Sequence, residues 1–336
     1  MNLVTGATGI VGSHVVLALL QNNLPVVACR QKSSDLKKVQ ELFSWYSAEH
    51  LFLKIKWVEV DIRDIFSIEE ALEGITNVYH CAGFVSFNPK ERKKIITVNE
   101  TGTKNVVDAC LHREISALCH VSSIGTINNL DYTLDLNEEV FWKKSGKESD
   151  YAISKYNGER EVWRGMEEGL NAVIVNPGVI LSPGFRQQSS SRLFEASFKG
   201  NKFYTGGMSA YIAASDVAKC MLELVERKKF GQRYILVENN YSFRDILSAM
   251  QRNFNKKGPG INASRLMLIV AGYLERCVCF FTGKERKITP ALINSAFNQQ
   301  LFSNQKIKKD LGIEFVPVYQ IIEQICKSYG VSEPKA

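Results

Sequence analysis

The stretch that decides the fold is VTGATGIVG, Val4 to Gly12, in which three glycines recur at every third position near the start of the chain. An apolar strand-like run precedes it, and an apolar helical pattern follows. Glycines at this spacing permit a tight turn, a close approach of a ligand to the backbone, and close packing of the helix on the strand. The helix amides then point at a bound anion. The expected contacts of a dinucleotide pyrophosphate are Gly6, Thr8, Gly9, Ile10 and Gly12.

Short β-branched runs alternate with helical patterns along most of the chain. This alternation predicts βαβ units, and therefore an α/β protein with a Rossmann-type, doubly wound parallel sheet. Helices are expected at Val11–Gln21 and at Glu100–His112, with Thr97 or Asn99 available to cap the second. The predicted strands are Leu3–Val4, Val26–Cys29, Trp57–Val60, Val78–Cys81, Leu118–Ser122, Val173–Asn176 and Tyr234–Val237.

A change of composition after Asn176, in NPGVILSPGF, marks a predicted domain boundary. We expect residues 1–176 to form the dinucleotide-binding domain, with a return segment at about 212–237. Residues 177–211 and 238–336 are then a smaller, mainly helical C-terminal substrate-binding domain.

The end of the second strand indicates which nucleotide binds. An acid there holds the ribose 2′-hydroxyl of NAD, whereas an arginine accommodates the 2′-phosphate of NADP. This chain has Arg30, with Lys37 nearby and Asp35 displaced into the loop. We therefore expect NADP(H), with NAD(H) as the alternative if these cations are only solvated loop residues.

The third strand ends in VEVDIRD, where Asp61 and the backbone of Ile62 are positioned to contact the adenine. Helix capping by Asp61 or Asp64 is the structural alternative.

Tyr151 and Lys155 in YAISK lie four residues apart, and therefore on one face of a helix. A nearby ammonium lowers the pKa of a phenol by stabilising the phenolate. Ser123, at the end of a predicted strand, supplies a hydroxyl for the same substrate oxygen. These three residues are the predicted catalytic group, although an ordinary amphipathic helix has the same Tyr-Lys spacing.

Several motifs in order resemble the extended short-chain dehydrogenase/reductase family, also called the NAD(P)-dependent epimerase/dehydratase family. The resemblance covers nearly the whole chain and is closest to the dihydroflavonol-reductase and 3β-hydroxysteroid-dehydrogenase branch. The matching motifs are Thr5–Gly12, Asp61–Ile62, His80–Gly83, Val98–Asn99 with Gly102–Thr103, Val121–Ser123, Tyr151–Lys155, Asn176–Gly178 and Phe302–Ile313.

The resemblance implies that Ser123, Tyr151 and Lys155 are catalytic, and that Tyr151 and Lys155 also contact the cofactor. It further implies cofactor contacts from Ala82, Gly83, Asn99, Pro177 and Val179. Dehydratases of the family carry Thr-Asp-Glu where this chain has Ser122-Ser-Ile124, which argues against dehydration. Epimerases usually carry glycine after the catalytic tyrosine, whereas Ala152 follows here.

The expected function is hydride transfer between NADP(H) and a carbonyl or secondary alcohol of a mainly apolar small molecule. The alternatives are a sugar-nucleotide epimerase with tightly bound NAD, and a non-catalytic relative that senses NADP. Candidate substrate contacts, each with core packing as the alternative, are Phe84, Phe87, Phe185 and Tyr211.

Composition restricts the other function classes. The net charge of +7 is dispersed, which argues against nucleic-acid binding. The eight cysteines form no Cys-x-x-Cys pair and are typical of buried thiols in a cytoplasmic protein. His14 and His80 have no metal-ligand spacing, so no metal is expected. A homodimer is compatible with the family.

The apolar stretch Leu266–Phe281 is interrupted by Glu275 and Arg276, so no integral membrane segment is expected. A buried or substrate-lining helix is the prediction for this stretch, and a membrane-surface helix is the alternative.

Overall fold

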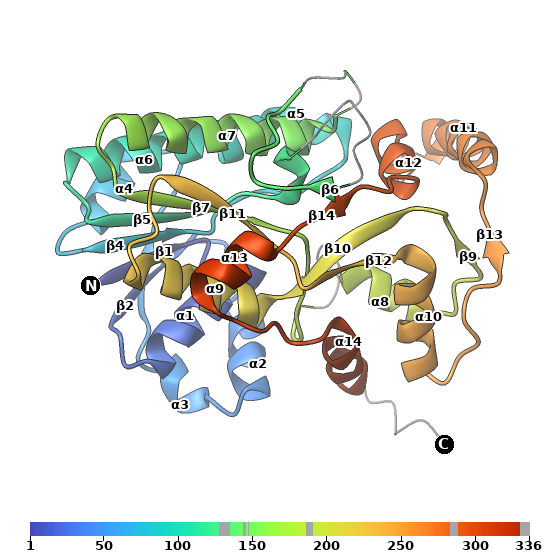
Figure 1. Ribbon diagram of the computed structural model, residues 1–336, viewed down its shortest axis with the longest axis horizontal. Helices are drawn as coiled ribbons and strands as arrows, with labels where there is room; N and C mark the ends of the chain where they lie inside the picture. Colours follow the sequence, from blue (N-terminus) through green and yellow to red (C-terminus); the bar gives the residue numbers. More distant parts are fainter. Residues whose placement is uncertain (128–134, 144–145, 147, 186–190, 283–287, 330–336) are drawn as a thin grey trace.

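A seven-stranded parallel sheet forms the centre of the molecule in the computed structural model, which describes residues 1–127, 135–143, 146, 148–185, 191–282 and 288–329 (Figure 1). The strand order is β11-β7-β5-β4-β1-β2-β3, and every neighbouring pair is parallel. This order confirms the predicted Rossmann-type fold. The strands are β1 Asn2–Thr5, β2 Val26–Arg30, β3 Lys56–Glu59, β4 Asn77–His80, β5 Ala117–Val121, β7 Ala172–Pro177 and β11 Gln232–Leu236.

Helices cover both faces of this sheet (Figure 1). Each face has its own buried apolar cluster, and the strands contribute alternate side chains to the two clusters. On one face lie α1 Ile10–Gln21, α2 Lys37–Trp45, α3 Glu49–Phe52, α9 Ala214–Glu226 and α13 Gln305–Leu311. On the other lie α4 Ile65–Ala71, α5 Arg92–Ile96, α6 Gly102–His112 and α7 Asp150–Glu167.

The sheet positions the predicted site. The chain crosses from one side of β1 to the other between β3 and β4, so β1 and β4 flank the point where the strand order reverses. Ligands of such sheets bind beyond the carboxyl ends of the strands at this point. The glycine turn after β1 and the segment after β4 both lie there.

The C-terminal lobe is built on a three-stranded sheet in the order β12-β10-β8. Its buried apolar cluster joins this sheet to α8, α10 and α14. The main elements are β8 Val179–Leu181, α8 Ser191–Phe198, β10 Met208–Ala213, β12 Asn239–Ser242, α10 Phe243–Asn253, α11 Arg265–Thr282, α12 Pro290–Ala296 and α14 Val318–Lys327. Short strand pairs join β6 Asp135–Leu136 with β14 Leu301–Phe302, and β9 Phe203–Tyr204 with β13 Ile261–Asn262.

Part of the last predicted segment joins the large sheet. Helix α13 packs against β11 and α9, and its Ile307 and Leu311 belong to the apolar cluster that contains α1. The segment 238–336 therefore contributes to both lobes. The predicted return strand is confirmed, because β11 pairs with β7.

Two local predictions are wrong. The helix expected to begin near Glu100 is continuous with α5 through a π-helical turn, Thr97–Thr101, so neither Thr97 nor Asn99 caps it. The Leu266–Phe281 stretch is not a buried helix, because α11 lies at the rim of the lobe and exposes most of its apolar side chains. Its alternative role, lining the substrate site, stays a prediction. Its Cys277 is also exposed, whereas Cys29, Cys110, Cys119, Cys220 and Cys326 are buried as expected.

No helix in the described part of the chain has the length and apolarity required to span a bilayer.

Candidate active site

The glycine turn after β1 has the geometry that the sequence predicts. Gly6 has φ +63°, and a Cβ added there would lie 2.6 Å from the backbone of Ala82. A Cβ on Gly12 would lie 2.2 Å from the carbonyl oxygen of Gly6. Both positions therefore require glycine. Gly6 requires it because of its positive φ and its contact with Ala82, and Gly12 because of its contact with the Gly6 carbonyl.

Gly9 differs from the other two glycines because a Cβ there would meet only the Gly6 carbonyl oxygen, at 3.3 Å. It begins α1 without a side-chain cap, and the first turn of α1 contains no acidic residue. The first amides of the helix are thus free to bind an anion. The turn fits a pyrophosphate, and Thr8 and Ile10 flank Gly9 within it.

The ends of β2 and β3 form the expected adenosine side of the site. The Arg30 guanidinium donates to Glu59 at 3.1 Å. Asp35 accepts a hydrogen bond from the Lys37 amide at 3.0 Å, which orders the start of α2. A hollow of about 500 Å³ lies beside these residues and is lined by Gln31, Lys32, Ser33, Glu59, Val60, Asp61 and Arg63.

The Asp61 carboxylate forms an ion pair with Arg63, a residue that the sequence analysis did not identify. Its carboxylate accepts from the Arg63 side chain at 2.9 and 3.0 Å. These hydrogen bonds lower the pKa of Asp61. Asp64, not Asp61, caps α4 by accepting from the Phe66 amide at 3.1 Å. An adenine contact from Asp61 therefore competes with Arg63, while Ile62 is buried beneath it.

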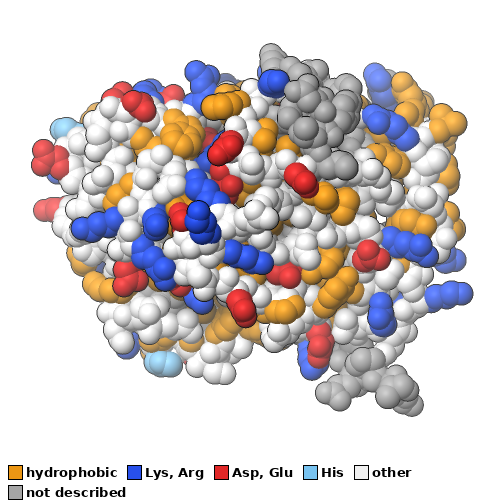
Figure 2. All heavy atoms as spheres, in the orientation of Figure 1, with side chains coloured by type: hydrophobic (Ala, Val, Ile, Leu, Met, Phe, Trp, Pro, Cys, Tyr) orange, Lys and Arg blue, Asp and Glu red, His pale blue; other side chains and the backbone are white. Residues whose placement is uncertain are grey.

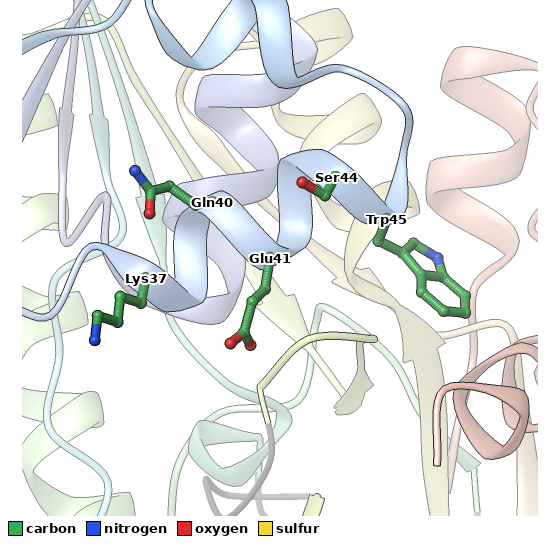
Figure 3. A pocket seen from close by; sticks show the side chains of 5 residues that line it. All are labelled: Lys37, Gln40, Glu41, Ser44 and Trp45. Atoms are coloured by element: carbon green, nitrogen blue, oxygen red, sulfur yellow. The ribbon is translucent and has the colours of Figure 1, made fainter. Parts of the chain in front are cut away.

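A second hollow, of about 680 Å³, lies along α2 (Figure 3). Figure 3 shows the lining side chains projecting from this helix, with the predicted cofactor residue Lys37 at its first turn. None of the predicted catalytic residues lines it. The lining residues are Lys37, Gln40, Glu41, Ser44 and Trp45.

Asn99 orders the segment that follows β4. Its side chain accepts from the Phe84 amide at 2.7 Å and donates to the Phe84 carbonyl at 2.9 Å. It also donates to Ser154 of α7 at 3.0 Å. A Cβ on Gly83 would lie 3.4 Å from the Asn99 side-chain oxygen and 3.9 Å from Lys155 Nζ. The predicted cofactor residues after β4 thus lie against α7.

Helix α7 positions the two predicted catalytic residues on one face. The helix is capped by Ser149, whose Oγ accepts from the Ala152 amide at 3.1 Å. Asp150 in the first turn complements the helix dipole. Tyr151 is half-buried, and Lys155, one turn later, is buried.

Ser123 lies next to the start of α7. It caps the 3₁₀ turn Ile124–Thr126, with its Oγ accepting from the Gly125 amide at 3.1 Å. A Cβ on Gly125 would lie 3.4 Å from Ser123 Oγ and 3.8 Å from Ala152 Cβ. Ser123 therefore lies beside the first turn of α7, where its side chain hydrogen-bonds that of Tyr151.

The pKa values of the pair differ from the expectation. Burial raises the pKa of Tyr151, and a hydrogen bond with Ser123 offsets part of the rise. The Lys155 Nζ donates to the Val121 carbonyl at 2.6 Å. Burial lowers the pKa of Lys155 to about 8, opposed by the charge of Glu159.

Glu159, one further turn along α7, is a buried charge that the sequence reasoning missed. Its Oε2 accepts from Ser122 at 2.7 Å and from Thr126 at 2.9 Å. Asn176 donates to the same oxygen at 2.9 Å. These contacts connect the helix of Tyr151 to the strand ends on either side of Ser123.

Arg233 of β11 completes this Glu159 network. Its guanidinium donates to Glu159 Oε1 at 3.0 Å and to the carbonyls of Glu138 and Val140 at 3.0 and 2.7 Å. Both partners of the ion pair are almost fully buried. The Tyr-x-x-x-Lys-x-x-x-Glu spacing is the only sequence signal that could have indicated Glu159.

The candidate substrate residues fall into two groups. Phe87 is half exposed and its ring meets the Tyr151 ring at 6.0 Å, while Phe84 lies beneath Lys94 at 4.0 Å. Phe185 and Tyr211 are buried in the core, which is the packing alternative. Their substrate contact stays a prediction.

Pro177 ends β7 and Val179 begins β8. Gly178 between them packs against the backbone of Ala210, with a Cβ placed 2.5 Å from its carbonyl oxygen. This close contact joins the end of the large sheet to the C-terminal lobe. The cofactor roles of Pro177 and Val179 stay predictions.

The histidines beside the site have structural partners. His14 Nδ1 pairs with the Ile10 carbonyl at 2.8 Å, and burial lowers its pKa to about 4. His80 lies between the hydroxyls of Thr5 and Thr103 at 2.7 and 3.1 Å. Among the described residues, no group of three or more His, Cys, Asp or Glu could hold a metal ion.

The parallel sheet and the glycine turn define a Rossmann-type fold of the kind that binds dinucleotides. The chain belongs to the NAD dependent epimerase/dehydratase family, the extended short-chain dehydrogenases/reductases, whose family model matches residues 2–237. This membership confirms the resemblance stated from the sequence.

Among its relatives, sterol demethylase protein B of Methylococcus capsulatus is 28% identical, over 74% of this chain and 73% of that protein. Cinnamoyl-CoA reductase 1 of Petunia hybrida is 26% identical, over 97% and 90%. Dihydroflavonol 4-reductase of Gerbera hybrida is 24% identical, over 77% and 75%. The relatives include the reductases of the branch that the sequence resembles.

Solved structures share the fold over the whole length. The crystal structure of gox2253 has a TM-score of 0.81 at 23% identity and covers 98% of each chain. Yeast methylglyoxal/isovaleraldehyde reductase Gre2, complexed with NADPH, has a TM-score of 0.75 at 20% identity, over 99% of this chain and 100% of that chain.

Proposed function

We propose that the protein is an NADP(H)-dependent oxidoreductase acting on a carbonyl or secondary alcohol of a mainly apolar small molecule. The observation that carries this proposal is the convergence of Ser123, Tyr151 and Lys155 beside the segment after β4. Relatives named as reductases support it at the level of the family. The bound nicotinamide supplies or accepts the hydride.

The chain's own residues handle the proton and the substrate oxygen. In the reducing direction the Tyr151 hydroxyl donates a proton to the carbonyl oxygen as that oxygen gains negative charge. Ser123 donates a hydrogen bond to the same oxygen, because its Oγ accepts from the Gly125 amide and its O–H remains to donate. Lys155 supplies positive charge next to Gly83. The half-exposed Phe87 ring provides an apolar contact beside Tyr151.

The substitution Tyr151→Phe tests the proposal in an NADPH-oxidation screen over aldehydes, flavonoid-like ketones and ketosteroids. Removing the proton donor should lower kcat by about 10²- to 10⁴-fold on any active substrate. NADPH binding, followed by isothermal titration calorimetry, should persist. Tyr156→Phe on the same helix is the matched control, since the Tyr156 ring stacks on Trp142 at 4.7 Å.

Undiminished turnover by Tyr151→Phe would remove the basis of the proposal. Tightly bound NAD that copurifies with the protein, without net consumption of NADPH, would indicate the epimerase alternative. NADPH binding without reduction of any carbonyl in the screen would indicate the cofactor-sensing alternative.

The preference for NADP(H) rests on two basic residues, Arg30 at the end of β2 and Lys37 at the start of α2. Relatives of this fold are solved with either nucleotide, NADPH in Gre2 and NAD in a UDP-glucose 4-epimerase of Thermus thermophilus. Glu59 holds Arg30 at 3.1 Å and repels a 2′-phosphate. The two side chains therefore act on the phosphate in opposite directions.

A pair of substitutions separates their effects. Arg30→Gln should weaken NADPH binding by about tenfold or more and leave NADH binding nearly unchanged, because only the 2′-phosphate loses a charged partner. Glu59→Gln should strengthen NADPH binding. Calorimetric titration of each variant with both nucleotides measures the change. Equal losses for NADPH and NADH in Arg30→Gln would contradict the NADP(H) preference.

A further inference from the structure

Helix α11 carries an exposed apolar surface that the proposed function does not use. We call this surface the α11 outer face and define it by Leu266, Val270, Tyr273, Leu274, Val278 and Phe281. Their spacing places them on one side of the helix. Leu266 is 69% exposed, Tyr273 64% and Phe281 84%. Contiguous apolar surface of this kind marks an interaction site.

The opposite side of α11 holds it against the lobe. Gly272 packs on Ile288, with a Cβ placed 3.2 Å from the Ile288 side chain. Glu275, the only acidic residue of α11, accepts a hydrogen bond from the Ile288 amide at 2.7 Å. Arg265 donates to Asn294 of α12 at 2.5 Å. The acid is thus turned toward the protein, and the outer face contains no charged residue.

Basic residues outnumber acidic ones in the part of the chain that contains α11. Figure 2 shows Lys and Arg side chains interspersed with hydrophobic ones along the right-hand edge of the molecule, where Figure 1 places α10 and α11. From Phe243 to Thr282 the basic residues are Arg244, Arg252, Lys256, Lys257, Arg265 and Arg276, and the acidic residues are Asp245 and Glu275. An apolar helix face in a region with an excess of basic residues complements an anionic lipid surface.

We infer that α11 docks the protein on an anionic lipid bilayer, with its outer face at the boundary of the acyl chains and basic residues of this edge of the molecule among the headgroups. Among the described residues no helix is fit to span a bilayer, so α11 lies along the surface. A second copy of the chain is a poorer occupant. A two-fold contact through α11 would bring the same excess of basic residues of both copies together, and like charges repel.

Flotation of the full-length protein with phosphatidylcholine vesicles, with and without phosphatidylserine, tests this inference. The wild type should bind vesicles that contain phosphatidylserine, bind neutral vesicles more weakly, and lose binding as salt is added. The double variant Leu266→Glu/Leu274→Glu should bind at least about tenfold more weakly. Both substitutions are at exposed helix positions where glutamate is a good helix former.

Leu53→Glu/Phe66→Glu is the matched control, because these residues are 86% and 77% exposed and lie outside the C-terminal lobe. This control should bind vesicles as the wild type does. Circular dichroism melting verifies that both double variants fold. The inference is overturned if the wild type does not float with any vesicle, or if Leu266→Glu/Leu274→Glu binds as well as the control. It is also overturned if light scattering shows a dimer that only the α11 variant dissociates, without vesicle binding.

Discussion

The sheet half and the C-terminal lobe depart from the usual distribution of side chains in opposite ways. Beside the predicted catalytic residues Ser123 and Tyr151, the sheet half buries the charges of Lys155 and Glu159 and satisfies them with hydrogen bonds. At its rim, the C-terminal lobe exposes the apolar α11 outer face. Buried charges and exposed apolar patches are the two kinds of exception that carry information about function.

The difference concerns what each region tolerates. In the sheet half, close backbone contacts and buried ion pairs leave no space for change, so substitutions there should cost stability as well as activity. In the C-terminal lobe, comparable positions at the surface should accept the same substitutions. Matched substitutions in the two regions can break or sharpen this contrast.

The largest expected effect is at the glycine turn. In Gly12→Ala the new Cβ would overlap the Gly6 carbonyl at 2.2 Å, and backbone cannot move away as a flexible side chain can. We expect a loss of more than about 4 kcal/mol in the free energy of unfolding, and no nucleotide binding. Gly206→Ala in the C-terminal lobe, with nothing within 4 Å, should be nearly neutral. Urea denaturation measures the free energy of unfolding of both variants. Equal values would contradict the proposed difference between the sheet half and the C-terminal lobe.

The Glu159 network gives the next largest effect. Glu159→Gln leaves Arg233 as a buried charge without its partner, which should cost about 3 kcal/mol. Glu323→Gln is the control in the C-terminal lobe, because its ion pair with Lys327 at 2.9 Å is exposed and should contribute less than about 1 kcal/mol. Urea denaturation measures the free energy of unfolding of both variants. An equal loss in Glu159→Gln and Glu323→Gln would show that the Glu159 network does not stabilise the sheet half.

Lys155 gives a smaller effect that depends on pH. Its pKa in the folded protein, about 8, is below the usual 10.5, so the unfolded chain binds more protons between these values. The stability of the wild type should therefore rise relative to Lys155→Met by about 2 kcal/mol from pH 7 to pH 10. Lys257→Met, at an exposed position of the C-terminal lobe, serves as the control. A pH-independent difference would contradict the burial of the ammonium.

Local steric demands made much of the sheet half predictable from sequence. The turn after β1 requires glycine at Gly6 and Gly12 because of contacts made within a short segment. The spacing of Tyr151 and Lys155 predicts a shared face for the same reason. The alternation of strands and helices then predicts the order in which these segments meet.

Contacts between distant segments were not predictable in this way. Arg233 follows Glu159 by 74 residues, and nothing in the local pattern of either residue indicates the pair. The apolar pattern of α11 is compatible with a buried helix, because whether a neighbour covers the helix depends on the tertiary fold. The pKa of Tyr151 likewise depends on burial and on a hydrogen bond with Ser123, which lies 28 residues earlier in the chain.

A crystal structure of the full-length protein with bound NADPH tests the central claim most directly. We predict the pyrophosphate on the amides that begin α1, and the Tyr151 hydroxyl and Lys155 amine on the nicotinamide side of the nucleotide. A nucleotide bound away from the turn at Gly9, or a Tyr151 hydroxyl directed away from the nicotinamide, would contradict hydride transfer at this site.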